Sequence, residues 1–205
     1  MQVSRRAIVI SAAVLFSAIG IYISSSSLSE TVVSDFPSTT LMKGCFDKYC
    51  IGDSGPGGGT IVYVDERGFD NSVEDDKSIG AMCLTGTCHY LEMAPTDLGR
   101  EYSWGKAIVA AEAFSTSSAN DWILPSKDAL NEICKYAFGD TVNVVCNDNG
   151  EGSLPLRLGG FSTYYTYWSS SEAGGNGAWF QYFLNGDQAN HYKDLTRYVR
   201  PVRAF

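Results

Sequence analysis

The six cysteines are the side chains whose type and spacing point most directly to chemistry. They form three couples that are close in sequence: Cys45 with Cys50, Cys83 with Cys88, and Cys134 with Cys146. These spacings do not favour a redox or zinc motif, and the chain has only two His. In an oxidising compartment such thiols form disulfides, and short loops cost little entropy to close. We therefore expect three bridges between sequence neighbours, although six cysteines also allow other pairings.

A second group of candidate residues lies toward the C-terminal end of the chain. Glycan recognition combines aromatic faces for apolar C–H patches with polar groups for hydroxyls, and sulfated glycans add Arg or Lys. After His191 the sequence has four basic residues and one acid, in a chain that is acidic as a whole. The predicted ligand-binding residues are Tyr164, Tyr165, Asn190, His191, Lys193 and Arg197.

The two later arginines, Arg200 and Arg203, have a simpler structural interpretation. They lie near the end of the chain, where pairing with Glu172 or Asp128 would hold the last residues in place. Whether they bind a ligand instead stays open at this level.

Catalysis is the weaker interpretation of the polar residues. Ser169, Ser170 and Ser171 precede Glu172, and together with His191 they include the residue types of a hydrolase. No G-x-S-x-G motif surrounds these serines, and hydrogen bonding at a strand end explains them more simply. A hydrolase of unknown substrate is therefore kept only as an alternative to a non-catalytic protein.

No cofactor or metal is predicted. The glycine-rich stretch 52–59 lacks the G-K-[ST] ending of a phosphate-binding loop and leads into a strand, so we interpret it as a structural turn. Residues 65–77 are acidic, and a second polar group consists of Asn147, Asp148, Asn149 and Glu151. Neither group has the D-x-D-x-D-G order of a calcium loop, so calcium dependence is left open.

Composition and charge limit the class of protein. The 205 residues are 44% hydrophobic, which is enough to build a core in one ordinary domain. The chain has 15 Lys and Arg against 23 Asp and Glu, a formal net charge of −8. Affinity for nucleic acid comes mainly from basic side chains that neutralise phosphates, so a nucleic-acid partner is excluded.

Residues 7–23 form an uncharged apolar run that follows Arg5 and Arg6. Such a run, with positive residues before it, is typical of a transmembrane helix or a signal peptide whose N-terminus stays in the cytoplasm. We expect residues 1–23 to be a signal anchor or a cleaved signal peptide, 24–42 a Ser/Thr-rich linker, and 43–205 one exported domain. That domain would face the periplasm from an inner-membrane anchor, or be secreted or displayed on the cell surface.

The elements that must position these residues are strands and two short helices. Alternating or aromatic residues predict strands over 60–65, 89–94, 164–168, 178–184 and 198–205, the last with Pro201 at an edge or bulge. Apolar residues at helical spacing predict one helix over 104–114, capped by Ser103, and another between Ser126 and Gly139. Asn185-Gly186 predicts a type I′ hairpin turn. This order indicates an α+β domain with mainly antiparallel sheet.

Several segments in a fixed order resemble one bacterial family, the C-terminal domain of the Legionella collagen-like adhesin. They cover roughly residues 50–205 and read IGDSGPGGG from 51, LEMAP from 91, DWILPSKD from 121, GGF from 159, YWSSSE from 167, AW from 178, Gln181, and YVRPVRAF from 198. Large apolar residues in these motifs are expected to be core residues rather than ligand contacts: Trp122, Leu124, Trp168, Trp179 and Phe205.

The resemblance implies a C-type-lectin-like fold and surface display, and the founding adhesin is associated with trimers and with sulfated glycosaminoglycan-type polysaccharides. This sequence has no Gly-X-Y repeats, so collagen-driven trimerisation is not implied, and a homo-oligomer is left open. It also lacks the E-P-N, Q-P-D and W-N-D signatures of calcium-dependent lectins, so calcium-mediated sugar binding is not expected.

The expected function is therefore non-catalytic adhesion or ligand binding outside the cytoplasm, with a glycan or another cell-surface ligand as partner and the membrane contacted through residues 7–23. A structural subunit of a surface fibre or pilus-like assembly is the alternative. The absence of the Gly-Phe-x4-Glu signature of type IV pilins weakens that alternative.

Overall fold

The computed structural model describes residues 44–72, 75–139, 146, 158–161 and 164–205. The predicted signal segment 1–23, the linker 24–42 and the polar group at 147–151 lie outside the described residues. Internal contacts divide the chain into residues 1–39 and 40–205, and all described residues belong to the second unit. Among the helices described, none combines the length and hydrophobicity that crossing a bilayer requires.

The described chain has a mixed α+β fold with antiparallel sheets and two α-helices, which confirms the predicted class at this level. The strands are β1 (Cys45–Phe46), β2 (Tyr49–Cys50), β3 (Thr60–Phe69), β4 (Cys88–Met93), β5 (Tyr102–Ser103), β6 (Thr166–Glu172), β7 (Gly177–Tyr182), β8 (Gln188–Tyr192), β9 (Thr196–Arg197) and β10 (Val202–Ala204). The helices are α1 (Trp104–Glu112), α2 (Lys127–Phe138) and two 3-10 turns, η1 (Ile79–Met82) and η2 (Leu158–Gly160).

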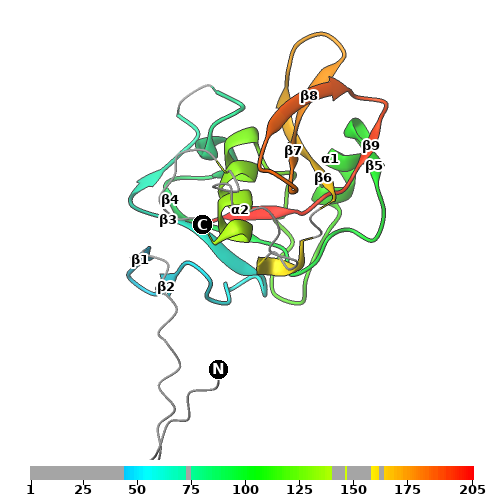
Figure 1. The fold of residues 1–205 in the computed structure, drawn as a ribbon. Helices are drawn as coiled ribbons and strands as arrows, with labels where there is room; N and C mark the ends of the chain where they lie inside the picture. The colour runs from blue at the N-terminus through cyan, green and yellow to red at the C-terminus, as the bar shows by residue number, and fades with distance from the viewer. Residues whose placement is uncertain (1–43, 73–74, 140–145, 147–157, 162–163) are drawn as a thin grey trace, which may run out of the picture. The chain divides into compact units, whose positions relative to one another are not determined.

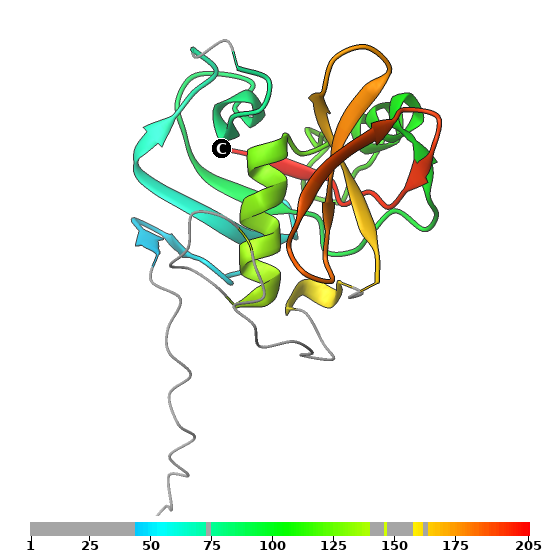
Figure 2. The ribbon, with the colours of Figure 1, turned by 45° about the horizontal axis from the view of Figure 1, so that its top comes forward.

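Two three-stranded antiparallel sheets form the framework, with the orders β10-β4-β3 and β6-β7-β8. Figure 1 shows α1 beside the second sheet, and Figure 2 shows α2 between the two sheets. The short strands pair as β1-β2 and β5-β9. Of the predicted ligand-binding residues, Asn190 and His191 lie on β8 of the second sheet, and Arg197 lies on β9.

Helix α2 begins and ends where the sequence predicts. The Ser126 Oγ accepts a hydrogen bond from the Ala129 N–H at 3.1 Å, which caps the first turn. At the other end Gly139 adopts the left-handed conformation, with φ of 70°, that glycine reaches without a steric penalty. Helix α1 also follows Ser103 as predicted, but the Ser103 side chain makes no capping bond and the helix ends at Glu112.

Two apolar clusters attach the helices to opposite faces of the β6-β7-β8 sheet. Neighbouring residues of a strand point to opposite faces, so Tyr167 and Trp168 of β6 enter different clusters. Tyr167 packs in the cluster of α2, and Trp168 packs in that of α1. Among the motif residues expected in the core, the buried ones are Trp122, Leu124 and Trp168, and the half-buried ones are Trp179 and Phe205.

The three predicted disulfides are confirmed: Cys45–Cys50, Cys83–Cys88 and Cys134–Cys146. The last pair is buried at both ends and fixes α2 to a residue that is 12 positions further along the chain. Three disulfides in one small domain indicate an extracytoplasmic protein, because thiols in the cytosol are kept reduced.

The glycine-rich loop before β3 surrounds a protein carboxylate. Glu92 of β4 is fully buried, and its oxygens accept hydrogen bonds from the N–H groups of Gly57 at 3.0 Å and Gly59 at 2.6 Å. A Cβ on Gly59 would lie 2.1 Å from a backbone oxygen, so this close approach requires glycine. Arg203 of β10 donates to the same carboxylate at 3.0 Å. In this structure the loop is the structural turn that the sequence predicts.

The predicted type I′ turn at Asn185-Gly186 is wrong. Among the described non-glycine residues only Asp47 has a positive φ, so Asn185 does not adopt the conformation that this turn needs. The Tyr182 N–H donates to the Asp187 oxygen at 2.8 Å, which closes a longer loop over 183–186. Burial of Phe183 in the α2 cluster explains the longer loop, because the chain must extend far enough to insert that ring.

The predicted strand over 198–205 is interrupted. Pro201 lies between β9 and β10, outside both strands, and only Val202–Ala204 pairs with β4. A proline has no N–H to donate to a ladder, so the paired segment begins after it. β10 is an edge strand of its sheet, as the presence of proline predicts.

Tyr63 of β3 should make stability sensitive to alkaline pH. Burial and the nearby Asp65 carboxylate raise the pKa of the Tyr63 hydroxyl to about 12. The folded state therefore holds this proton more tightly than the unfolded state, whose tyrosines titrate near 10. The stabilisation is complete below about pH 10 and is lost as the pH rises toward about 12.

We expect Tyr63→Phe to flatten this alkaline loss of stability. Urea unfolding at a series of pH values between neutrality and pH of about 11 measures the free energy for the wild type and the variant. Tyr164→Phe, which changes a phenol that is 83% exposed, is the matched control and should follow the wild type. Identical slopes for wild type and Tyr63→Phe would contradict the assignment.

Candidate ligand-binding groove

The six predicted ligand-binding residues lie at two separate ends of the β6-β7-β8 sheet. Strand β6 is roughly 20 Å long at the usual rise per residue. At the Glu172 end, the Lys193 Nζ contacts the Glu172 carboxylate at 2.7 Å, and Asn190 and His191 lie on the adjoining part of β8. At the Thr166 end the structure places the other three: Tyr164, Tyr165 and Arg197. The six residues therefore do not lie together in one compact site.

The two tyrosines at the Thr166 end have different surroundings. The Tyr165 ring stacks on Tyr198, with centroids 3.9 Å apart and planes at 8°. Tyr164 is 83% exposed. Tyr165 thus already has an aromatic partner within the domain, whereas Tyr164 remains a free surface ring.

The placement of Arg197 does not support its predicted role in ligand contact. The residue is buried, its guanidinium lies 3.4 Å from the Phe180 ring centroid, and its Nη1 donates to the Thr166 hydroxyl at 2.8 Å. β9 pairs with β5, so alternate residues face opposite sides: Thr196 points outward and Arg197 inward. Burial lowers the pKa of this guanidinium from its usual value. Arg197 is a core residue of the α1 side.

The other terminal cations are also engaged within the domain. Arg200 pairs with Asp97 at 2.6 Å, and Arg203 pairs with Glu92 and with Asp121 at 2.7 Å. The structural interpretation of these arginines is supported, but the predicted partners Glu172 and Asp128 are wrong. Both true carboxylate partners of Arg203 precede it by more than 80 residues, so they could not be found from local sequence. The basic residues after His191 do not form a free cationic patch.

A surface groove of about 450 Å³ lies at the Glu172 end, between β8 and the loop that joins β6 to β7. Its lining residues are Gly174, Asn176, Gly177, Asn190, His191 and Tyr192. Strand pairing places Gly177 opposite Tyr192, and a Cβ on Gly177 would lie 3.8 Å from the Asn190 Oδ1. Because Gly177 has no side chain, space remains open above β7 at this point. The neighbouring β8 residues Asn190, His191 and Tyr192 form one wall of the groove.

The lining side chains are polar or aromatic, and none of the six carries a formal charge when histidine is neutral. Asn176 and Asn190 offer both amide donors and acceptors, which match sugar hydroxyls. Tyr192 is 62% exposed and presents an aromatic face. The His191 Nδ1 accepts from the Tyr192 N–H at 2.8 Å, so a neutral imidazole carries its proton on Nε2 and can donate outward.

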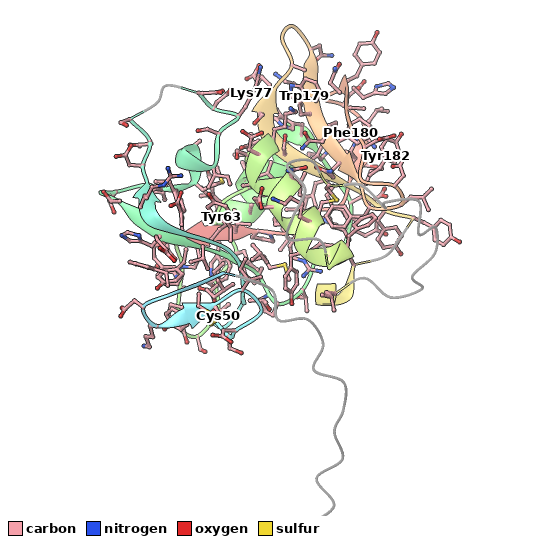
Figure 3. All side chains as sticks on the ribbon, turned by 60° about the vertical axis from the view of Figure 1, so that its left-hand side comes forward. Cys50, Tyr63, Lys77, Trp179, Phe180 and Tyr182 are labelled. Carbon is pink, nitrogen blue, oxygen red and sulfur yellow. A yellow bond between two sulfur atoms is a disulfide. The ribbon has the colours of Figure 1, made fainter. Side chains whose placement is uncertain are left out.

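Lys193 lies beside the groove but is half-buried. Its Nζ contacts Glu172 and lies 4.3 Å from the Trp104 ring centroid of α1. These contacts hold the ammonium on the α1 side of the sheet. Figure 3 shows the side chains of the adjoining strand, with Trp179, Phe180 and Tyr182 labelled along β7.

Two of the three serines considered for hydrolysis, Ser169 and Ser171, have structural partners for their hydroxyl groups. The Ser169 Oγ donates to the Trp179 oxygen at 2.9 Å, and the Ser171 Oγ donates to the Asp76 oxygen at 3.0 Å. Both residues are fully buried, so their hydroxyls do not face a substrate. His191 makes its recorded hydrogen bond with Tyr192 rather than with a serine.

A family model of the Lcl C-terminal domain matches residues 82–203, more than half of the chain. The chain belongs to the Lcl C-terminal domain family. This confirms the resemblance that its motifs suggest, and the match includes the whole β6-β7-β8 sheet with its groove. The glycine-rich loop and the Cys45–Cys50 bridge lie before the matched residues. A search of the curated proteins found no match.

Sequence reasoning missed four of the groove residues: Gly174, Asn176, Gly177 and Tyr192. The signal was the Gly-Gly-Asn-Gly run between two aromatic strands, which indicates a hairpin. Recognising it as a wall of the groove also requires the pairing of β7 with β8, which brings Gly177 opposite Tyr192.

Proposed function

We propose that this Lcl C-terminal domain is a non-catalytic adhesion or ligand-binding domain, and that the groove at Gly177 binds an uncharged glycan. The proposal rests on one observation: the groove lining combines two amides, an imidazole and an exposed tyrosine, without a paired or free cation. Sugars are bound by aromatic faces together with amide and other polar groups. A sulfated polysaccharide would need cations that the terminal region uses internally.

We also propose a fold type, a role for residues 7–23 and a location for this domain. The fold is C-type-lectin-like, which the mixed architecture with two helices, antiparallel sheets and disulfides supports. Residues 7–23 anchor or export the chain, which their apolar composition supports. The domain acts at the cell surface or in the periplasm, which the disulfides support.

The proposal predicts a selective effect of Tyr192. We expect Tyr192→Ala to weaken binding to a neutral glycan by about tenfold, because an aromatic contact contributes up to about 1.5 kcal/mol. Asn190→Ala should have a similar effect through lost hydroxyl contacts. The measurement is a glycan array followed by titration of the best neutral ligand, using the full chain.

Two controls make this experiment specific. Tyr164→Ala removes a tyrosine that is still more exposed, 83% against 62% for Tyr192, at the distant Thr166 end, and should leave affinity unchanged. Gly177→Ala should reduce binding because its Cβ narrows the groove, whereas Gly99→Ala adds a methyl group in open space. Retention on heparin or dextran sulfate that falls with salt and survives Tyr192→Ala would reject the neutral-glycan groove.

A further inference from the structure

The outer edge of β8 has backbone groups without partners in the described structure. The Tyr182 N–H bonds to Asp187, and the Lys193 N–H bonds to Asn176, so odd-numbered residues of this segment face β7. Gln188 and Asn190 therefore direct their N–H and C=O groups away from the sheet. Within the described residues, no hydrogen bond is recorded for these four groups. β8 is the edge strand of the β6-β7-β8 sheet, and Figure 2 shows it in dark orange in front of β7.

β8 also lacks the features that usually protect an edge strand. Its sequence QANHY has no proline and no Lys, Arg, Asp or Glu, and its register with β7 has no bulge. The opposite edge strand is covered, because the Trp168 N–H bonds to Tyr198 and the Ser170 N–H bonds to Pro125. The edge strand β3 of the other sheet contains Glu66 and Arg67 and has shifts in register.

We propose that β8 pairs with β8 of a second copy of this chain, in an antiparallel arrangement with the two-fold axis at Ala189. In this register Gln188 faces the second copy's Asn190, and the reverse. Each such pair exchanges both backbone hydrogen bonds, which uses all four free groups. Ala189 lies opposite Ala189 of the second copy at the axis, where a small side chain allows close approach.

The polar side chains that flank these pairs also fit this register, because a neutral imidazole can donate its Nε2–H to a carboxylate. Asp187 faces the second copy's His191, so each dimer contains two acid–imidazole pairs on the same side of the sheet. Asp187 and His191 are both exposed in the isolated domain. The self-complementary pattern favours a second copy over an unrelated peptide, because the two-fold pairing that satisfies Gln188 and Asn190 also places each Asp187 opposite a His191.

Charge substitution at these exposed positions tests the proposal without touching the core. His191→Asp places two carboxylates against two others in the dimer, and we expect the dissociation constant to rise by at least about tenfold. Adding Asp187→Lys to the same chain places opposite charges across each of these pairs and should recover the dimer. Sedimentation velocity of the full chain over a concentration series provides the measurement.

Asn176→Asp is the matched control, since it adds a carboxylate to the same groove but not opposite Asp187. It should leave dimerisation unchanged. A wild type that stays monomeric at all concentrations, a closed trimer, or a dimer that His191→Asp does not weaken would each overturn the proposal. The measured mass is independent of glycan binding, so a failure here is distinct from a failure of the proposed function.

Discussion

Glu92→Ala is expected to lower the free energy of unfolding by about 3–5 kcal/mol, because the substitution removes a buried charge that accepts hydrogen bonds from two buried backbone N–H groups and from Arg203. The carboxylate accepts from Gly57 at 3.0 Å, Gly59 at 2.6 Å and Arg203 at 3.0 Å. Without it, two backbone N–H groups and a guanidinium nitrogen lose their acceptor, and an unsatisfied buried donor costs about 1–3 kcal/mol. The ion pair between Glu92 and Arg203 also joins β4 to β10, so its loss weakens the β10-β4-β3 sheet.

Urea unfolding measures this loss, and Asp121→Ala is the matched control. Asp121 holds the same arginine from the exposed side of the ion pair, where its side chain is 43% exposed. We expect a loss of about 1 kcal/mol or less for an exposed pair of this kind. Glu92→Gln should lie between the two variants, because the amide oxygen still accepts one bond. Equal losses for Glu92→Ala and Asp121→Ala would disprove the special role of the buried carboxylate.

The second large effect is expected at the buried disulfide of α2. Replacing Cys134 and Cys146 together by Ala should lower the free energy of unfolding by about 3 kcal/mol, from the loop that the bridge closes in the unfolded chain. Both residues are buried, so a cavity adds to the loss. Double replacement of Cys45 and Cys50 is the comparison, with an expected loss of about 2 kcal/mol because the loop is shorter and Cys45 is exposed.

Urea or thermal unfolding of both double variants under non-reducing conditions gives the order of the two losses. A larger loss for the Cys45 and Cys50 variant would mean that the short β1-β2 loop has a greater role than its exposure suggests. That outcome would locate the important constraint before the matched family domain rather than inside it.

Some features of the fold were predictable because they depend on neighbours in the sequence. The ends of α2 follow from Ser126 and Gly139, whose side chain and backbone act within one turn. The three disulfides join cysteines that are already close along the chain, so local loop closure was a sufficient guide.

Other features failed because a distant contact competes with a local preference. Asn185-Gly186 favours a two-residue turn, but burial of Phe183 lengthens the loop. Arg197 has the character of a surface cation, yet pairing of β9 with β5 turns its side chain toward Phe180. In both cases the free energy of core packing exceeds the local tendency of the residue type.

The amino-acid sequence by itself determined the family, the α+β class, the disulfide pairs and the limits of α2, since motifs and short-range spacing carry that information. Only the tertiary structure decided which residues share a surface. Glu92 reaches Arg203 across 111 positions, and Gly177 meets Tyr192 through a strand register. Such contacts depend on how sheets and helices bury their apolar faces together, a long-range balance that no single segment encodes.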